Sequence, residues 1–421
     1  MFHTQLLATT SAHLEHTATR LPGGDVLIAG GLDAEGAAQA KATRFIAATE
    51  DFLDATPMPA PSRRHTATLL PDGSVLFVGV GEAQGGVALY EPVADRWLPL
   101  PSPTFPRVEH AATLLADGTV LIAGGRPAAA LAAAEGPARR DVEVLTSSER
   151  FDPATRAWLP GPPLGTPRRK FGLFTLPGGG VLAIGGKGIG PSGSPVRLKN
   201  AERTDAGLTA FSALPRMDQS ERDLCQLADG RVVGHSGHVF AADGASVERF
   251  ESGFRGGGAM VALADGRVAC FGQTGDEVFD PDAGEWAPSG PARKLHQRGH
   301  TATLLESGAV LVVGGTAGRG KAAGYAALVD VDLEWQPVEI TADDFESAEK
   351  LLDMLVEQGA LELDDEEEGI EPLLAPVARL LRYVEGAGNQ AAAMSRLLLE
   401  HDAVADFFLD DQQLKRLLAQ W

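Results

Sequence analysis

The chain has 421 residues, of which 44% are hydrophobic and 22% charged, as in ordinary globular proteins. This length is too great for one ordinary core and predicts several units or one large unit built from repeats. The formal net charge of −21 argues against nucleic acid or an anionic membrane as a partner, because neither is attracted to such a field.

The N-terminal sequence MFHTQLLATTSAHLEH has no basic region, no long apolar run and no small-residue cleavage signature. No stretch of the chain reaches the roughly 18 apolar residues that a membrane helix needs. We therefore expect a cytoplasmic protein. Its two cysteines, Cys225 and Cys270, fall in different repeats. Two reduced thiols are the favoured interpretation, and a disulfide is the alternative.

A short pattern recurs along the chain: a strand, a turn of the Asp-Gly type, and a second apolar strand that ends in small residues. Residues 65–79, HTATLLPDGSVLFVG, show it clearly. The second strand opens on the same residue type in seven repeats, at Val26, Val75, Val120, Val181, Val232, Val268 and Val310. In four repeats it ends in a glycine pair, at Gly30-Gly31, Gly124-Gly125, Gly185-Gly186 and Gly314-Gly315.

A second set of regularly spaced residues supports the same division into seven repeats. Bulky residues seven positions apart mark a third and a fourth strand, as in Phe45/Phe52, Tyr90/Trp97, Phe151/Trp158 and Phe279/Trp286, with weaker pairs at Thr204/Phe211, Phe240/Val247 and Leu328/Trp335. Turns such as Asp152-Pro153 lie between the paired positions. Each repeat therefore supplies four strands, at the spacing of propeller blades.

These features predict a mainly β fold: a seven-bladed β-propeller over residues 13–340, followed by a small all-α helical bundle over 341–421. Residues 1–12 are either a lead-in or an added outer strand of the closing blade. The repeats resemble the kelch repeat, in particular its bacterial form in the propeller domain of galactose oxidase.

The resemblance invites comparison with copper-radical chemistry, which needs two tyrosines, a cysteine crosslinked to one of them, and two histidines. Tyr90 and Tyr325 are the propeller tyrosines and both fall in third strands, while the cysteines fall in inner and second strands. We therefore exclude that oxidase chemistry and predict no cofactor and no metal. A histidine that opens the inner strand recurs at His16, His65, His110 and His300. The resemblance implies a structural role for it, with hydrogen bonds to neighbouring backbone.

The residues just before this histidine position enter the inner strands and should line one mouth of the central channel. They are strongly basic, and the predicted binding residues are Arg63, Arg64, Arg107, Arg168, Arg169, Arg222, Arg255 and Arg298, with Lys170 beside them. The acids there are Glu15, Glu109 and Glu221. One interpretation is that these arginines pair with acids of the next blade. The other is a mouth that binds an anion or an acidic peptide.

Two insertions interrupt the repeats, and the composition changes after residue 340. Residues 126–141 predict a short Ala-rich helix in blade 3, and residues 187–199 a Gly/Pro/Ser loop in blade 4. After residue 340, apolar residues at helical spacing predict four or five short helices. The acidic run Asp364–Glu368 lies between the first two of them and is either a solvated linker or a dock for a basic surface.

The leading functional prediction is a non-enzymatic protein–protein interaction module, with the propeller as platform and the tail as adaptor. Its partners would be proteins, possibly acidic ones, with no nucleic acid and no membrane involved. The first alternative is a propeller that binds carbohydrate or an anion. A less favoured one is a sugar epimerase or lyase that uses arginine and glutamate at the mouth.

Overall fold

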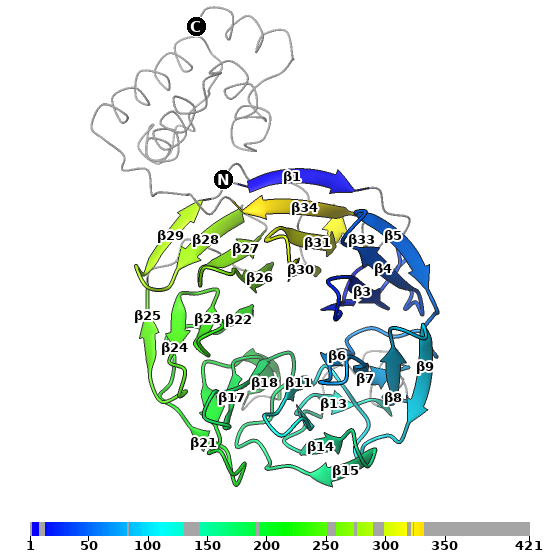
Figure 1. The fold of residues 1–421 in the computed structure, drawn as a ribbon. Coiled ribbons are helices and arrows are strands. Elements are labelled where there is room, and N and C mark those ends of the chain that lie inside the picture. The colour runs from blue at the N-terminus through cyan, green and yellow to red at the C-terminus, as the bar shows by residue number, and fades with distance from the viewer. Residues whose placement is uncertain are drawn as a thin grey trace, which may run out of the picture. The chain divides into compact units, whose positions relative to one another are not determined.

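The computed structural model describes residues 2–7, 13–81, 84–129, 143–190, 193–221, 223–250, 258–272, 276–288, 299–317, 321–322 and 324–331. In this part of the chain, seven four-stranded antiparallel sheets form a ring, with their first strands toward the centre (Figure 1). The predicted seven-bladed propeller is therefore confirmed. The predicted helical bundle of residues 341–421 and its acidic run lie outside the described residues.

The blades share one strand order, from the centre outward. The inner strands are β2 (Thr17–Arg20), β6 (Thr66–Leu69), β11 (Ala111–Leu114), β16 (Gly172–Thr175), β22 (Leu224–Gln226), β26 (Ala259–Ala262) and β30 (His300–Leu304). The second strands are β3 (Val26–Ala29), β7 (Val75–Val80), β12 (Val120–Ala123), β17 (Val181–Ile184), β23 (Val232–Gly234), β27 (Val268–Phe271) and β31 (Val310–Gly314).

The outer half of each blade follows the same plan. The third strands are β4 (Ala42–Ile46), β8 (Gly86–Glu91), β14 (Ser148–Asp152), β20 (Ala201–Arg203), β24 (His238–Phe240), β28 (Asp276–Asp280) and β34 (Ala326–Val331). The fourth strands are β5 (Asp51–Ala55), β9 (Arg96–Leu100), β15 (Ala157–Pro160), β21 (Ser212–Ala213), β25 (Val247–Arg249), β29 (Glu285–Pro288) and, for the last blade, β1 (Phe2–Leu7).

The last blade departs from one of the sequence predictions. Its fourth strand is β1, which pairs with β34 in antiparallel register from Phe2↔Val331 to Leu7↔Ala326 (Figure 1). The N-terminal segment thus closes the ring, which is the second of the two predicted possibilities. The fourth strand expected around Trp335 falls outside the described residues, and Leu328 pairs with Gln5 instead. Closure of this kind joins the two ends of the propeller by backbone hydrogen bonds.

The hydrophobic core lies between the blades. All seven anchoring valines are fully buried, and seven clusters of buried apolar side chains each join two adjacent blades, the last with the first. The predicted aromatic pairs face each other across the third and fourth strands, as Tyr90↔Trp97 and Phe151↔Trp158 do. Trp97 also donates to Thr56 O of the preceding blade at 2.7 Å. A blade on its own would leave both faces exposed, so its stability depends on its neighbours.

The glycine pairs lie where two blades touch. Gly124 and Gly125 both have positive φ, and the Gly125 N–H donates to Arg168 O of the next blade at 2.8 Å. A Cβ on Gly124 would stand 2.3 Å from that same oxygen. The close approach leaves no room for a side chain, which explains the glycine preference.

The recurring histidine links each blade to its predecessor. His65 Nε2 lies 3.0 Å from Thr17 Oγ1, and His110 Nε2 lies 2.9 Å from Thr66 Oγ1. His16 repeats the contact with Thr301 at 2.9 Å, across the closure of the ring. His300 instead contacts the backbone, at Phe271 O and Ala259 N. These contacts fit the predicted structural role: three of the four histidines contact a threonine side chain, and the expected backbone hydrogen bond is made by His300 and, to Ala29, by His65.

These buried histidines predict a loss of stability in mild acid. Burial lowers the pKa of His65 to about 4, that of His110 to about 3 and that of His300 to about 4. In the unfolded chain the pKa of a histidine is near 6.5. Below that pH the unfolded state therefore binds protons that the folded state does not bind. The free energy of unfolding should be highest above pH 6.5 and fall by about 1.4 kcal/mol per pH unit for each histidine down to pH ~4.

Urea unfolding at a series of pH values measures this slope. The variant His110→Gln should lower the slope by the share of one histidine, whatever its effect on stability at pH 8. A slope that is unchanged in this variant would contradict the assignment.

Candidate functional site

The candidate site lies on the rim where the chain enters the inner strands of blades 1 to 4. Glu15, Arg64, Glu109 and Lys170 each stand directly before the inner-strand histidine position, and each has a positive φ between 50° and 58°. The Arg64 N–H donates to Glu15 O, the Glu109 N–H to Arg64 O, and the Lys170 N–H to Glu109 O, at 3.3, 3.2 and 2.9 Å. We call these four linked residues the charged arc.

This backbone conformation is uncommon for residues other than glycine and is tolerated where surrounding structure enforces it. Here the enforcement comes from the hydrogen bonds between successive rim loops. The arc therefore places four alternating charges, acid and base, on a fixed backbone.

Glu109 is the centre of the ion pairs. Its carboxylate is 1% exposed and lies 3.1 Å from Arg64, 3.2 Å from Arg126, 2.5 Å from Arg169 and 3.4 Å from Lys170. Burial alone would raise the pKa of Glu109, but the four cations outweigh it and hold that pKa below its usual value. Glu109 is thus a buried carboxylate whose ionised form is stabilised by four basic side chains.

Glu15 is the more accessible acid. It is 22% exposed and lies 2.6 Å from Arg64, 3.4 Å from Lys170 and 3.9 Å from Arg63. Burial opposes its ionisation, but the hydrogen bond from Arg64 and the charges of Arg64, Lys170 and Arg63 keep the pKa of Glu15 below its usual value.

Two further basic residues extend the site beyond the predicted set. Arg126 opens β13 (Arg126–Pro127), which pairs with β10 (Arg107–Val108). Lys187 opens β18 (Lys187–Ile189), which pairs with β19 (Pro195–Arg197) and so faces Arg197 in register. Burial, Lys170, Arg169 and Arg197 lower the pKa of Lys187, and Glu109 opposes them. Within the 187–199 insertion, which the sequence predicts as a Gly/Pro/Ser loop, β18 and β19 therefore form an antiparallel pair.

These two residues can be found in the sequence by their position. Arg126 and Lys187 each directly follow the glycine pair that ends a second strand, and each lies at the rim close to Glu109. The predicted Ala-rich helix that would follow Arg126 lies mostly outside the described residues.

The predicted binding arginines separate into three groups. Arg63, Arg64 and Arg169 lie in the ion-pair cluster around Glu15 and Glu109. Arg107 and Arg168 are fully buried and pair with Glu149 and Glu202 of their own blades at 2.7 and 2.6 Å. The remaining predicted residues, Arg222, Arg255 and Arg298, lie outside the described part of the chain.

Blade 5 does not contribute its acid to the arc in the same way. Glu221 has the same sequence position as Glu109, but its side chain is fully buried and contacts His235, Ser236 and His238 of its own blade. Burial would raise the pKa of Glu221, yet hydrogen bonds with the two histidines and the serine hold it at about 2. All the contacts named here for the Glu221 carboxylate are with residues of its own blade.

Comparison with known proteins supports the fold assignment. No family model and no curated protein matches the sequence. A solved structure described as a novel fungal alcohol oxidase of the AA5 family, in complex with copper, is similar with a TM-score of 0.58 and 16% identity, over 80% of this chain and 78% of the other. A second similar structure is that of YjhT, with a TM-score of 0.50 and 14% identity, over 77% of this chain and 97% of the other.

The chain therefore has the kelch-like seven-bladed propeller fold. The comparisons contradict the prediction of a non-enzymatic interaction module, because a propeller of this fold belongs to an alcohol oxidase.

The copper of the fungal enzyme has no counterpart among the residues described. These contain no group of three or more His, Cys, Asp or Glu side chains placed to hold a metal ion. Tyr90 Oη donates to Asp95 at 2.7 Å in the outer half of blade 2, and burial raises the pKa of Cys225 to about 12. The residues described do not fit a copper-radical centre, so we derive no step through one.

Arg168 and Arg169, neighbours in blade 4, allow a test of which arginine supports the fold and which belongs to the charged site. Arg168→Ala should lower the free energy of unfolding by about 3–5 kcal/mol, because it leaves Glu202 charged and buried without its partner. Arg169→Ala should cost clearly less, because three other cations still compensate the buried Glu109 carboxylate. Urea unfolding measures both, and losses of equal size would contradict this division.

Proposed function

We propose that this propeller is an enzyme that binds a small anionic, polyhydroxylated molecule, such as a sugar acid, at the charged arc. The proposed chemistry is proton transfer, as in an epimerase or a lyase. The supporting observation is the excess of positive charge around two carboxylates. Arg126, Arg169 and Lys170 share the Glu109 carboxylate, and Lys187 and Arg197 add two more charges.

An incoming carboxylate would complement this excess. Among the residues described, neither Lys187 nor Arg197 forms an ion pair, although the whole chain carries a net charge of −21. Guanidinium groups bind carboxylates through two parallel hydrogen bonds, and the fixed rim backbone limits the entropy lost on binding. A neutral sugar would gain none of this charge complementarity.

Glu15 is the proposed acid–base residue. It is ionised in the free protein, and a bound anion nearby would raise its pKa toward the range where it can both accept and return a proton. Glu15 would remove the proton from the carbon next to the substrate carboxylate, and the C–H electron pair would form an enolate. The arc cations would stabilise the developing negative charge.

The enolate has two productive fates. In an epimerase, the opposite face of the same carbon would receive a proton from a second group, for which we propose the Lys170 ammonium, while Glu15 releases the proton that it removed to solvent. In a lyase, the electron pair would form a carbon–carbon double bond and expel the hydroxyl group of the neighbouring carbon, which leaves as water with the proton held by Glu15. The accessible position of Glu15, in contrast to buried Glu109, supports its assignment to this role.

Binding and chemistry can be measured separately. We expect glucuronate or galacturonate to bind saturably in calorimetry, while glucose and galactose do not. Lys170→Ala should weaken binding of the acid at least tenfold, because it removes a cation that contacts both carboxylates. The matched control is Arg20→Ala, which removes a basic residue from the opposite end of an inner strand. Equal weakening by both variants, or no binding of either acid, would overturn the proposal.

The proton-transfer step has its own readout. In D2O, the wild-type protein should exchange the hydrogen beside the substrate carboxylate, as followed by proton NMR. Glu15→Gln should lower the exchange at least 100-fold while the acid still binds. Exchange that persists in this variant would remove Glu15 from the mechanism, and binding without any exchange in the wild-type protein would indicate a binding protein rather than an enzyme.

A further inference from the structure

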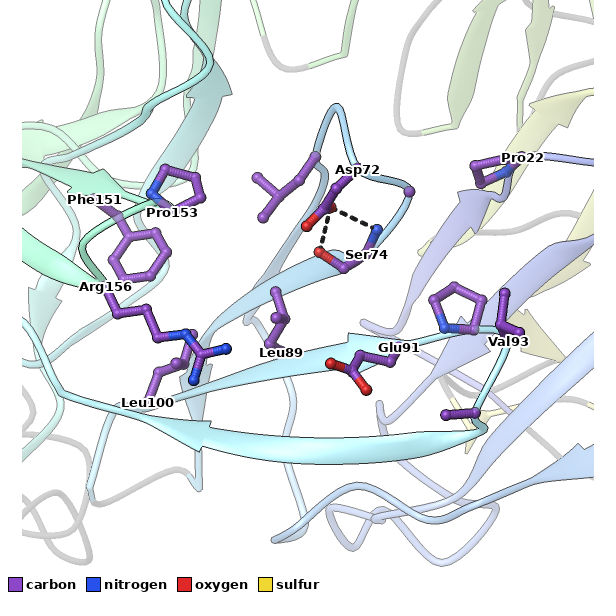
Figure 2. A pocket seen from close by; sticks show the side chains of 14 residues that line it. Pro22, Asp72, Ser74, Leu89, Glu91, Val93, Leu100, Phe151, Pro153 and Arg156 are labelled. Atoms are coloured by element: carbon purple, nitrogen blue, oxygen red, sulfur yellow. Dashed lines mark hydrogen bonds between the residues drawn. The ribbon is translucent and has the colours of Figure 1, made fainter.

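A second candidate site lies at the opposite ends of the inner strands from the charged arc. The pocket has a volume of about 420 Å³, within the range of small-molecule sites (Figure 2). Strand β6 begins beside Arg64 at the arc and ends at the Leu70–Ser74 turn, which lines this pocket. The two sites are therefore separated by the length of a strand.

The pocket combines an apolar surface with a rim of prolines. Blade 2 supplies Leu89 and Leu100, and blade 3 supplies Phe151. Pro22, Pro92 and Pro153, from three different blades, also line the pocket, and Figure 2 shows Pro22 and Pro153 on opposite sides of it. Such a surface suits the hydrocarbon part of a ligand, because its burial releases ordered water.

Arg156 supplies a positive charge on the blade 3 side. It occupies the turn between β14 and β15 with a φ of 56°, two residues before Trp158. In blade 2 the same position is Asp95, whose carboxylate is tied to Tyr90 Oη and to Thr56 N. Within the described part of the chain, Arg156 has neither an ion pair nor a hydrogen-bond partner. Its guanidinium is thus available to a ligand.

Two carboxylates stand on the blade 2 side (Figure 2). Asp72 uses Oδ1 to accept hydrogen bonds from Ser74 N and Ser74 Oγ, at 2.9 and 2.6 Å. Glu91 uses Oε2 to accept from Arg96. Each carboxylate keeps one oxygen that accepts no hydrogen bond from the residues described, so both can receive a cationic group.

We propose that this pocket binds a small zwitterion with an apolar body, that is, an apolar amino acid or a short peptide. Arg156 would hold its carboxylate, and Asp72 and Glu91 its ammonium group. The apolar side chain would rest mainly on Leu100, which is partly exposed, because Leu89 and Phe151 are 9% and 1% exposed and belong to the core. Opposite charges at two ends of an apolar floor match this class of ligand and disfavour a simple anion, which Asp72 would repel; Glu91, whose charge Arg96 partly offsets, would contribute its second oxygen as a hydrogen-bond acceptor.

Calorimetry with L-leucine, L-phenylalanine and the dipeptides Leu-Leu and Phe-Leu tests the proposal. At least one of them should bind saturably, and more tightly than N-acetyl-leucine, which lacks the ammonium group, and leucinamide, which lacks the carboxylate. Arg156→Ala and Glu91→Gln should each weaken binding at least tenfold. Arg156→Gly, which suits the positive φ, should reproduce the loss without harm to the fold.

The matched control is Arg150→Ala, which removes an arginine of the neighbouring strand β14 that pairs with Asp117 outside the pocket. It should leave binding unchanged. The proposal is overturned if none of the four probes binds saturably, or if binding survives Arg156→Ala and Arg156→Gly. Because the pocket and the charged arc are tested with different ligands and different variants, failure of one proposal leaves the other intact.

Discussion

The structure depends on packing between blades. Each blade places its valine-led second strand between two neighbours, and in the described part of the chain every cluster of the core joins two adjacent blades. No blade of this kind can bury both of its faces alone, so the ring must close. The antiparallel pairing of β1 with β34 closes the ring through backbone hydrogen bonds. The contact between His16 and Thr301 also joins the first and last blades, at their inner strands.

The same packing creates the candidate site. Successive blades approach closely enough for rim loops to exchange backbone hydrogen bonds, and these bonds hold Glu15, Arg64, Glu109 and Lys170 in a left-handed conformation. Charged side chains on so fixed a backbone are preorganised, which is what anion recognition and electrostatic catalysis both require. Loops inserted after the glycine pairs then add Arg126 and Lys187 to the same place.

One short basic stretch shows how neighbouring residues can have different roles. In Arg168-Arg169-Lys170, the first side chain turns inward to Glu202, the second pairs with Glu109 and the third reaches both acids of the arc. Arg107 repeats the inward role in blade 3, with Glu149. The predicted pairing with an acid of the next blade occurs at Arg64, which contacts Glu109, whereas Arg107 and Arg168 pair within their own blades, which the sequence did not suggest. Anion binding at the basic mouth stays a prediction.

The sequence alone determined the repeat. The number of strands and their register follow from the seven valines, the glycine pairs and the aromatic pairs. Every blade packs against two neighbours in the same way, so the same residue types recur at the same positions. It also pointed to the basic rim. Only the tertiary structure decided that β1 closes the ring, that Glu109 gathers four cations from different loops, and that Arg107 and Arg168 are buried. These features depend on contacts between segments far apart in the chain, whose side-chain directions a local pattern does not encode.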